Sequence, residues 1–271
     1  MSQLDRITLL CASFAAVGLT VAGCEADERR PLTLGVPTTV QDSGLLDALL
    51  PEFRRAHPEY RVKFVAAGSG ELLALGRRGD LDVLLSHSPS AELEFVEAGH
   101  GTLRRQVMEN DFVIVGPPSD PAAIGPLDDA VVALARIAAA GALFLSRGDD
   151  SGTHRKELEL RAEAGLGVGG PGYREVGQGM GAVVRAASEL GAYTLCDRAT
   201  YLNLSETLNL EILVEGDPRL RNVYSVIQVA RAAQPDGARA FAEWIASDAG
   251  RQAIAGYGRE RFGLSLFRPT R

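Results

Sequence analysis

The chain has 271 residues, of which 46% are hydrophobic and 23% charged, as is typical of a soluble globular protein with one large or two modest domains. Its formal net charge of −7 argues against a nucleic-acid partner and against a basic membrane-binding surface. Of its 28 Lys and Arg residues, only Lys63 and Lys156 are lysines, so a single arginine is weak evidence of function in this chain.

The first residues have the pattern of a signal peptide. Arg6 supplies a positive charge, and an apolar run follows from Ile7 to Val21. This run is too short and too rich in Ala and Gly for a membrane-spanning helix. We therefore expect residues 1–23 to be a targeting segment that the mature protein lacks.

The cleavage point resembles that of bacterial lipoproteins, because Val-Ala-Gly precedes Cys24. We expect lipid on Cys24 to anchor the protein to a membrane, and residues 24–30 to form a solvated tether. The alternative is an ordinary secretory signal in which this cysteine has no role. Because Cys11 would leave with the signal, Cys196 would be the sole cysteine of the folded part, which excludes an intrachain disulfide.

Beyond the tether, short apolar runs alternate with amphipathic stretches. The runs predict strands at 32–36, 62–66, 82–85, 112–115, 142–145, 173–176, 192–195, 211–214 and 224–229. The amphipathic stretches predict helices at 45–55, 71–78, 91–98, 130–140, 154–164, 181–190, 236–247 and 250–257. This alternation predicts an α/β fold with mainly parallel sheets, in which ligands bind beyond the carboxyl ends of the strands.

Polar residues follow the first two predicted strands. At the first junction the hydroxyls of Thr38 and Thr39 could face a ligand, or the segment could be a turn in which Asp42 or Ser43 caps the next helix. At the second junction a Gly-Ser-Gly turn around Ser69 would let the backbone approach a ligand, although such turns are also common without one.

The third junction, 146–154, is the most informative segment of the chain. It reads Ser-Arg-Gly-Asp-Asp-Ser-Gly-Thr-His and lies between an apolar run and a predicted helix. The first N–H groups of a helix have no intrahelical partner, and the helix dipole places positive charge there, so this position favours an anion. Arg147 can add a forked cationic donor, and Ser151 and Thr153 can add hydroxyls. The segment therefore predicts an anion-binding site.

A fourth junction, 177–181, reads Gly-Gln-Gly-Met-Gly and could present backbone donors or be a flexible loop.

The sequence gives little indication of catalytic residues. Asp149 and Asp150 are adjacent, which suits a helix N-terminus better than acid–base catalysis, and His154 is expected to support the pocket. No His/Cys spacing resembles a zinc site, and no nucleophile motif is present. We therefore expect a binding protein without enzymatic activity, cofactor or bound metal cation.

Taken together, these motifs resemble one family, the substrate-binding lipoproteins of tungstate-uptake ABC transporters, a branch of the type II periplasmic binding proteins. The resemblance covers nearly everything after the signal. The matching segments are 42–46, 110–117, 146–154, 177–181, 192–195 and 214–218.

The resemblance implies which residues line the pocket. They are Thr38, Thr39, Ser69, Arg147, Ser151, Gly152, Thr153 and Gly179. Two positions depart from the family's pattern at the first junction, where a longer run of Thr and Ser is usual and Pro37 and Val40 stand here. At the second junction Ser69 replaces the usual threonine and keeps the hydroxyl.

The family's fold consists of two α/β lobes joined by two crossing strands, with the ligand in the cleft between them. Carried over, lobe 1 comprises 31–111 and 225–271, and lobe 2 comprises 112–224. Anion binding would close the lobes by a hinge motion.

The resemblance implies a function in transport. The protein would be a monomeric, membrane-anchored lipoprotein on the periplasmic or extracytoplasmic face, which captures tungstate and delivers it to an ABC transporter permease. Molybdate is a second candidate ligand. Alternatives are a binding protein for phosphate or sulfate, an anion-sensing lipoprotein without a permease, and a hydrolase acting on an anionic substrate, for which no nucleophile–base pair is recognisable.

Overall fold

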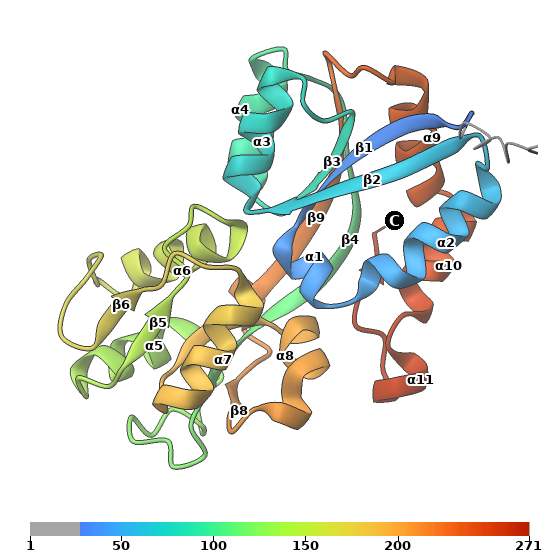
Figure 1. The fold of residues 1–271 in the computed structure, drawn as a ribbon. Helices are drawn as coiled ribbons and strands as arrows, with labels where there is room; N and C mark the ends of the chain where they lie inside the picture. Colours follow the sequence, from blue (N-terminus) through green and yellow to red (C-terminus); the bar gives the residue numbers. More distant parts are fainter. Residues whose placement is uncertain (1–27, 271) are drawn as a thin grey trace, which may run out of the picture.

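Two long strands, β4 (Gly101–Gly116) and β9 (Arg221–Val229), connect two α/β lobes in the computed structural model, which describes residues 28–270 (Figure 1). The predicted signal peptide and Cys24 lie outside the described residues. The predicted tether, 24–30, is one residue too long, because strand β1 begins at Arg30 and pairs there with Tyr60.

Lobe 1 is built on one sheet with the strand order β10-β4-β9-β3-β1-β2. Its other strands are β1 (Arg30–Pro37), β2 (Tyr60–Ala67), β3 (Val83–Ser86) and β10 (Arg268–Pro269). Its helices are α1 (Thr38–Asp42), α2 (Leu45–Ala56), α3 (Ser69–Arg78), α4 (Pro89–Glu97), α9 (Pro235–Ile245), α10 (Asp248–Gly256) and α11 (Arg259–Phe262). Successive residues of β3 alternate between the two faces, since Val83 and Leu85 join one hydrophobic cluster and Leu84 another.

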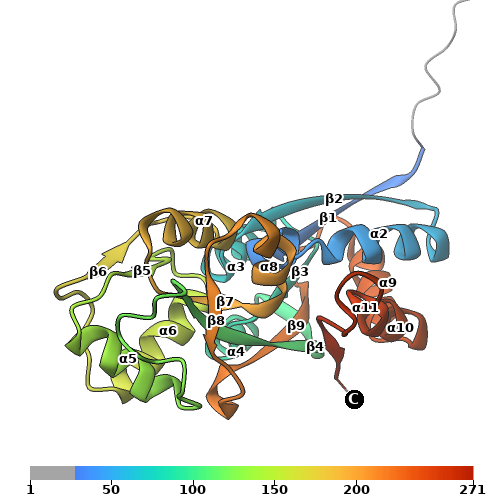
Figure 2. The same cartoon turned by 90° about the horizontal axis from the view of Figure 1, so that it is seen from below.

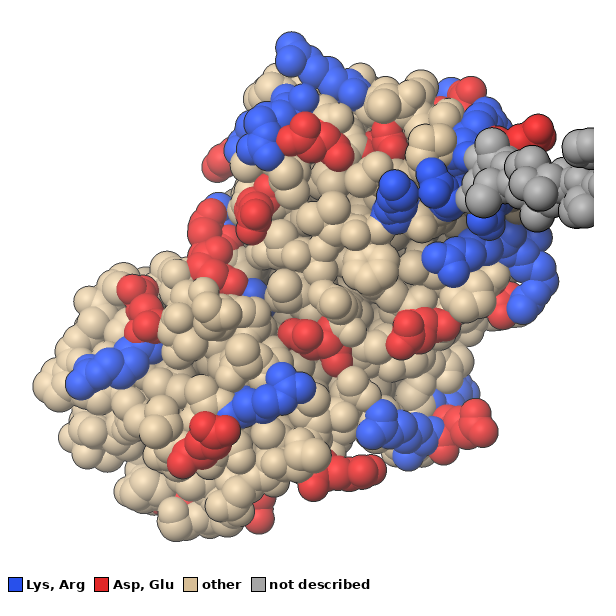
Figure 3. Space-filling model, in the orientation of Figure 1, with Lys and Arg blue, Asp and Glu red and all other residues tan. Residues whose placement is uncertain are grey.

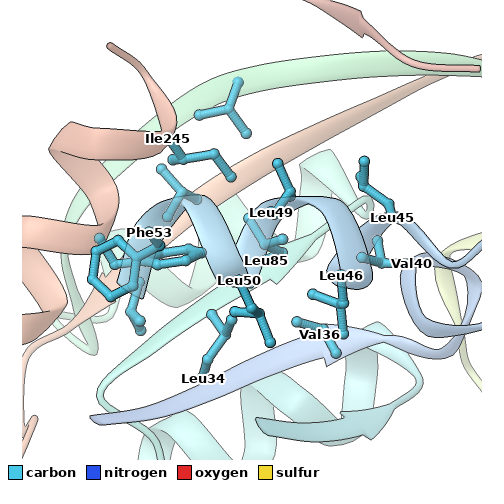
Figure 4. Packing of buried hydrophobic residues seen from close by; sticks show 14 of the residues in the cluster. Leu34, Val36, Val40, Leu45, Leu46, Leu49, Leu50, Phe53, Leu85 and Ile245 are labelled. Atoms are coloured by element: carbon cyan, nitrogen blue, oxygen red, sulfur yellow. The ribbon is translucent and has the colours of Figure 1, made fainter. Parts of the chain in front are cut away.

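The packing of α2 shows why this segment is a helix. Leu45, Leu46, Leu49, Leu50 and Phe53 recur at spacings of three and four, so they share one side of the helix. Figure 4 shows this side packed over β1 and against α9. The lobe-1 core is therefore encoded by local periodicity.

Lobe 2 contains strands β5 (Phe144–Ser146), β6 (Tyr173–Glu175), β7 (Thr194–Asp197) and β8 (Glu211–Val214). Its helices are α5 (Ala130–Ala139), α6 (Gly152–Glu163), α7 (Met180–Leu190) and α8 (Arg198–Leu204), with 3₁₀ turns η1 (Ser205–Thr207) and η2 (Pro218–Leu220). The end of β4 pairs with β7 and β8, and β5 pairs with β6 (Figure 2). Neighbouring residues of β4 belong to different cores, because Phe112 and Ile114 join one cluster and Val113 and Val115 the other.

The α/β prediction is confirmed, but the expected dominance of parallel pairing is wrong. The β1–β2, β1–β3 and β5–β6 pairs are parallel, whereas every pair that involves β4 or β9 is antiparallel. The reason is topological, because β4 leaves lobe 1 and β9 returns to it along the same path.

Several features went unpredicted or were misplaced. The expected turn at the first junction contains helix α1. The elements α8, α11 and β10 were not anticipated because each is short, from two to seven residues. The first two thirds of β4 were missed because Arg104, Arg105 and Gln106 interrupt any apolar alternation there. The strand predicted at 192–195 lies two residues later, as β7.

Candidate functional site

The site lies where helices of both lobes begin. Helices α1 and α3 of lobe 1 follow β1 and β2, while α6 and α7 of lobe 2 follow β5 and β6. Pro37, Gly68 and Gly179 precede α1, α3 and α7, and none of these residues has a polar side chain to cap the first N–H groups. The starts of α1 and α3 therefore offer backbone donors to whatever occupies the cleft, whereas one of the first N–H groups of α7, that of Gly181, donates to Asp42 of lobe 1.

Arg147 is the central charged group. It is 2% exposed, and its Nη2 donates to Thr38 Oγ1 across the lobe boundary at 3.0 Å. Its Nε donates to Asp149 Oδ2 at 3.1 Å, and Asp149 Oδ1 accepts from the Ser151 N–H at 3.2 Å. A buried guanidinium needs such a partner, so Asp149 both orients Arg147 and offsets part of its charge. The sequence indicates Asp149 only as a residue of the helix start, so its positioning role is a finding of the structure.

The beginning of α6 supplies further donors. Ser151 Oγ caps the helix by accepting from the His154 N–H at 3.2 Å. The hydroxyl of Thr153 is buried and has no hydrogen-bond partner among residues 28–270. A buried hydroxyl without a partner is costly, so a ligand oxygen at this place would satisfy it. His154 accepts from the Asp150 N–H through Nδ1, at 3.1 Å, and its role in supporting the pocket stays a prediction.

The lobe-1 residues face the hinge as well as the cleft. The Oγ1 of Thr39 lies 3.3 Å from the Tyr224 hydroxyl, so this side chain is turned away from Arg147 toward β9. Ser69 is fully buried, and its Oγ accepts from the His87 N–H at 3.5 Å. Val40 lies in the lobe-1 core, so its apolar side chain removes no donor from the cleft.

Glycines let the two lobes approach closely. A Cβ on Gly152 would lie 2.6 Å from Cδ2 of His87, and one on Gly70 would lie 2.3 Å from Oδ2 of Asp150. Gly68 and Gly179 are less crowded, with a Cβ at 3.4 Å from Ser151 and 3.6 Å from Thr38, respectively. Glycine is therefore required at Gly152, where a Cβ would also lie 2.7 Å from the His87 carbonyl oxygen, whereas at Gly70 the exposed Asp150 side chain could move aside.

Asp42 links the lobes directly. Its Oδ2 accepts from the Gly181 N–H at 2.9 Å, so a carboxylate of lobe 1 caps helix α7 of lobe 2. Its backbone carbonyl accepts from Asn203 Nδ2 of α8 at 2.8 Å. Of the two candidates for capping the next helix, Asp42 does not serve α2, which has Gly44 at its cap position, whereas Ser43 Oγ accepts from the Leu45 N–H at the start of α2 at 3.4 Å. Capping in trans leaves no signature in sequence spacing.

A buried polar network joins the site to the hinge strands. Asn222 Nδ2 donates to Asn110 Oδ1 at 2.8 Å and to the Tyr224 hydroxyl at 2.9 Å, which leaves Asn222 Oδ1 to accept from His87 Nδ1 at 2.9 Å. Burial lowers the pKa of His87 to about 4, so the ring is neutral near pH 7 and stacks on Tyr224 with centroids 4.9 Å apart. The network runs from His87 through Asn222 and Tyr224 to Thr39, and sequence reasoning missed it.

Two more buried groups lie near the site. Burial raises the pKa of Asp197 to about 6, and this residue caps α8 by accepting from the Thr200 N–H at 2.9 Å. Burial also raises the pKa of the Cys196 thiol. A hollow of about 650 Å³ adjoins the site and shares His87 and Gly152 with it.

Across the part of the chain that the structure describes, no three His, Cys, Asp or Glu side chains are grouped as a metal site requires. No helix between residues 28 and 270 is long and apolar enough to cross a membrane. The chemistry of the cleft is thus that of hydroxyls, backbone N–H groups and one arginine, which suits an oxyanion.

Comparison with known proteins agrees with this chemistry. Residues 25–249 match the model of the PBP superfamily domain. The chain is 41% identical to the tungstate-binding protein TupA of Peptoclostridium acidaminophilum, over 98% of this chain and 99% of that protein.

Two solved structures are also similar. The tungstate ABC transporter protein of Geobacter sulfurreducens shares 42% identity, with a TM-score of 0.77 over 84% of this chain and 99% of that one. The tungstate-binding protein TupA of Desulfovibrio alaskensis shares 39% identity, with a TM-score of 0.71 over 89% of this chain and 98% of that one. These findings confirm the predicted resemblance and the predicted type II fold. The chain therefore belongs to the PBP superfamily and, within it, to the family of the tungstate-binding proteins of ABC transporters.

Proposed function

We propose that this protein is the extracytoplasmic binding component of an ABC transporter, which captures tungstate in the interlobe cleft and delivers it to a permease. The observation that carries the proposal is the buried guanidinium of Arg147, which reaches across the lobe boundary to Thr38. The relatives named for tungstate binding support the choice of ligand.

The oxyanion would be held from both lobes. Arg147, Thr153 and the N–H groups that begin α6 would bind it from lobe 2, together with Ser151, Gly152 and Gly179. Thr38, Ser69 and the backbone at Thr39 would bind it from lobe 1. Each hydrogen bond to a charged oxygen contributes about 1.5–3 kcal/mol, so several such bonds suffice for tight binding. No group in this set is an activated nucleophile, which supports a transport role without catalysis.

Selectivity would follow from size. The metal–oxygen bonds of tungstate and molybdate are longer than the sulfur–oxygen bonds of sulfate. Donors spaced for the larger anions would be too far from some sulfate oxygens to form hydrogen bonds, so sulfate would bind more weakly. Molybdate is close in size to tungstate and is the expected competitor.

The proposal extends to the chain's location. We infer that residues 1–23 are a signal peptide and that lipid on Cys24 anchors the mature protein, as a monomer, to a membrane outside the cytoplasm. The Val-Ala-Gly-Cys sequence supports this, and the mass of the N-terminal peptide of the native protein tests it.

A calorimetric titration tests the ligand. Tungstate should bind with one site per chain in the presence of excess sulfate and phosphate, and molybdate should compete for the same site. Thermal unfolding should shift upward with the logarithm of tungstate concentration, because ligand binds only the folded state. Saturation by sulfate or phosphate, with tungstate inert, would refute the proposal.

A further inference from the structure

A group of cations gathers at the end of lobe 1 where the chain enters the fold. We call this group the basic face; its members are Arg29, Arg30, Arg54, Arg55, Arg61 and Lys63. Three carboxylates are close to it in the chain, those of Glu28, Glu52 and Glu59. Figure 3 shows Lys and Arg concentrated beside the grey N-terminal segment. A protein with a net charge of −7 thus carries a locally positive surface.

The fold creates this face from separate elements. Arg30 begins β1 and lies beside Tyr60 of β2, with its guanidinium 4.5 Å from the centre of that ring. Lys63 follows on β2, which is the last strand of the sheet, and Arg54 lies at the end of α2. Both side chains are exposed and form no ion pair with any residue between 28 and 270, so their charges are available to a partner.

Two exposed apolar residues adjoin these charges. Phe64 and Val65 of β2 are 42% and 39% exposed; Val65 lies on the same face of the strand as Lys63, and Phe64 on the other face. Cations flanking exposed apolar side chains suit the boundary between lipid headgroups and acyl chains. The exposed cations and the exposed apolar side chains of this face thus both favour contact with a lipid surface.

The chain itself brings this face to a membrane. Five residues lie between Cys24 and Arg30, so the two residues can be at most about 22 Å apart when the chain is fully extended. A lipid on Cys24 would therefore keep the start of β1 close to the headgroups, where the local concentration of lipid is high. Anionic headgroups attract such clusters of Lys and Arg over short distances, and salt weakens the attraction.

We propose that the basic face is a membrane-contact surface that lies on the headgroups of anionic lipids. The inference rests on the proposed lipid anchor at Cys24. Strand β1 begins at this face and ends at the cleft, eight residues away, so the contact holds the cleft roughly 25 Å from the headgroups. The anchored protein would thus rest on the bilayer with its cleft turned to the solution and leave this pose to meet the permease. The net charge of −7 argued against a basic membrane-binding surface. A total charge does not show that cations are concentrated on one part of the surface, so that argument does not apply to the basic face.

The two lysines of the chain provide the test, because Lys63 belongs to the basic face and Lys156 lies on α6 of lobe 2. The full lipidated protein is placed in vesicles of phosphatidylcholine, with or without phosphatidylglycerol, and treated with an acetylating reagent. Mass spectrometry then gives the acetylation rate at each lysine. We expect phosphatidylglycerol to slow acetylation of Lys63 severalfold, high salt to restore it, and Lys156 to stay unchanged.

Matched variants separate local contact from net charge. Substituting Arg54→Glu and Arg55→Glu should abolish the protection of Lys63, whereas Arg136→Glu and Arg174→Glu change the net charge equally on exposed sites of lobe 2 and should preserve it. Circular dichroism checks that both variants fold.

Three results overturn the proposal in distinguishable ways. An anchored protein in which Lys63 reacts equally in both lipids overturns the membrane contact and leaves the anchor and the transport function intact. Equal slowing at Lys63 and Lys156 shows a general lipid effect and also overturns the contact. An unmodified Cys24, read from the mass of its peptide, overturns the anchor and with it this surface, while tungstate binding is measured independently.

Discussion

The lobe-2 wall of the cleft carries the charge and is organised by its own hydrogen bonds, whereas the lobe-1 wall is neutral and depends on partners from elsewhere. On lobe 2, Asp149 holds Arg147, and Ser151 caps the helix that it precedes. On lobe 1, Thr39 bonds to the hinge and Thr38 to Arg147 of the other lobe. From this difference we expect a division of labour, in which lobe 2 binds the anion first and lobe 1 completes the site when the cleft closes.

Removal of the charged group should have the largest effect. Arg147→Ala deletes the only arginine identified in the site, so the affinity for tungstate should fall at least about a hundredfold, since each charge-assisted bond is worth about 1.5–3 kcal/mol. Calorimetry measures the loss, and Arg136→Ala, an exposed arginine of α5, is the control. An unchanged affinity would remove Arg147 from the site.

The same substitution on the two walls should give unequal effects. Thr153→Val removes a buried hydroxyl that has no partner among the described residues, so the anion would lose a donor and affinity should fall about tenfold. Thr39→Val removes a hydroxyl that faces Tyr224, and affinity should change by less than about threefold. Equal losses at both positions would show that the two walls contribute alike and contradict the comparison.

Asp42 should act on closure rather than on the anion. Asp42→Ala removes the cap that lobe 1 supplies to α7, which is worth about 0.5–2 kcal/mol to the closed state, so affinity should fall about 2- to 30-fold. Small-angle scattering of the saturated protein should show a smaller closed fraction. Asp47→Ala, an exposed residue of α2, should change neither measurement. A closed fraction equal to that of the wild type would show that the hydrogen bond between Asp42 and the Gly181 N–H does not stabilise the closed state.

Glu157, beneath the lobe-2 wall, should affect stability and hardly affect binding. Burial raises the pKa of Glu157 from an ordinary 4.5 to about 7, and its carboxylate accepts from the Tyr173 hydroxyl at 2.9 Å. The folded state then binds this proton more tightly than the unfolded state, so Glu157 lowers the stability progressively as pH rises from about 4.5 to 7. The Glu157→Gln variant should not lose stability in this way as pH rises, because glutamine has no proton to release.

Urea unfolding at several pH values measures this effect. The free energy of unfolding of the Gln variant, relative to wild type, should rise by on the order of 2–3 kcal/mol between pH 4.5 and 7. A difference that stays constant over this range would show that Glu157 titrates normally.

The charged wall could be predicted from the sequence because its residues are contiguous. Arg147, Ser151 and Thr153 lie within seven residues, between a strand and a helix, and local rules of helix capping and dipoles apply to them. The packing of α2 was predictable for the same reason, since its apolar periodicity is local.

Other features could not be predicted because they depend on contacts between distant segments. Asp42 caps a helix 139 positions away, and His87 reaches Asn222 across 135 positions. Neither pairing leaves a pattern at short spacing. The direction of the Thr39 hydroxyl likewise depends on a distant residue, Tyr224 of β9. Because the sequence does not show this contact, the sequence-based prediction put the hydroxyl in the cleft.

The central claim is that a tungstate ion is bound between Arg147 and the lobe-1 wall. Crystals of the complex, with diffraction collected at the tungsten absorption edge, test it most directly because the anomalous signal locates the metal atom without reference to the protein. We predict one strong peak per chain, within hydrogen-bonding reach, through the oxyanion's oxygens, of Arg147, Thr153 and Thr38. A peak elsewhere, or none in crystals grown with saturating tungstate, would contradict the account.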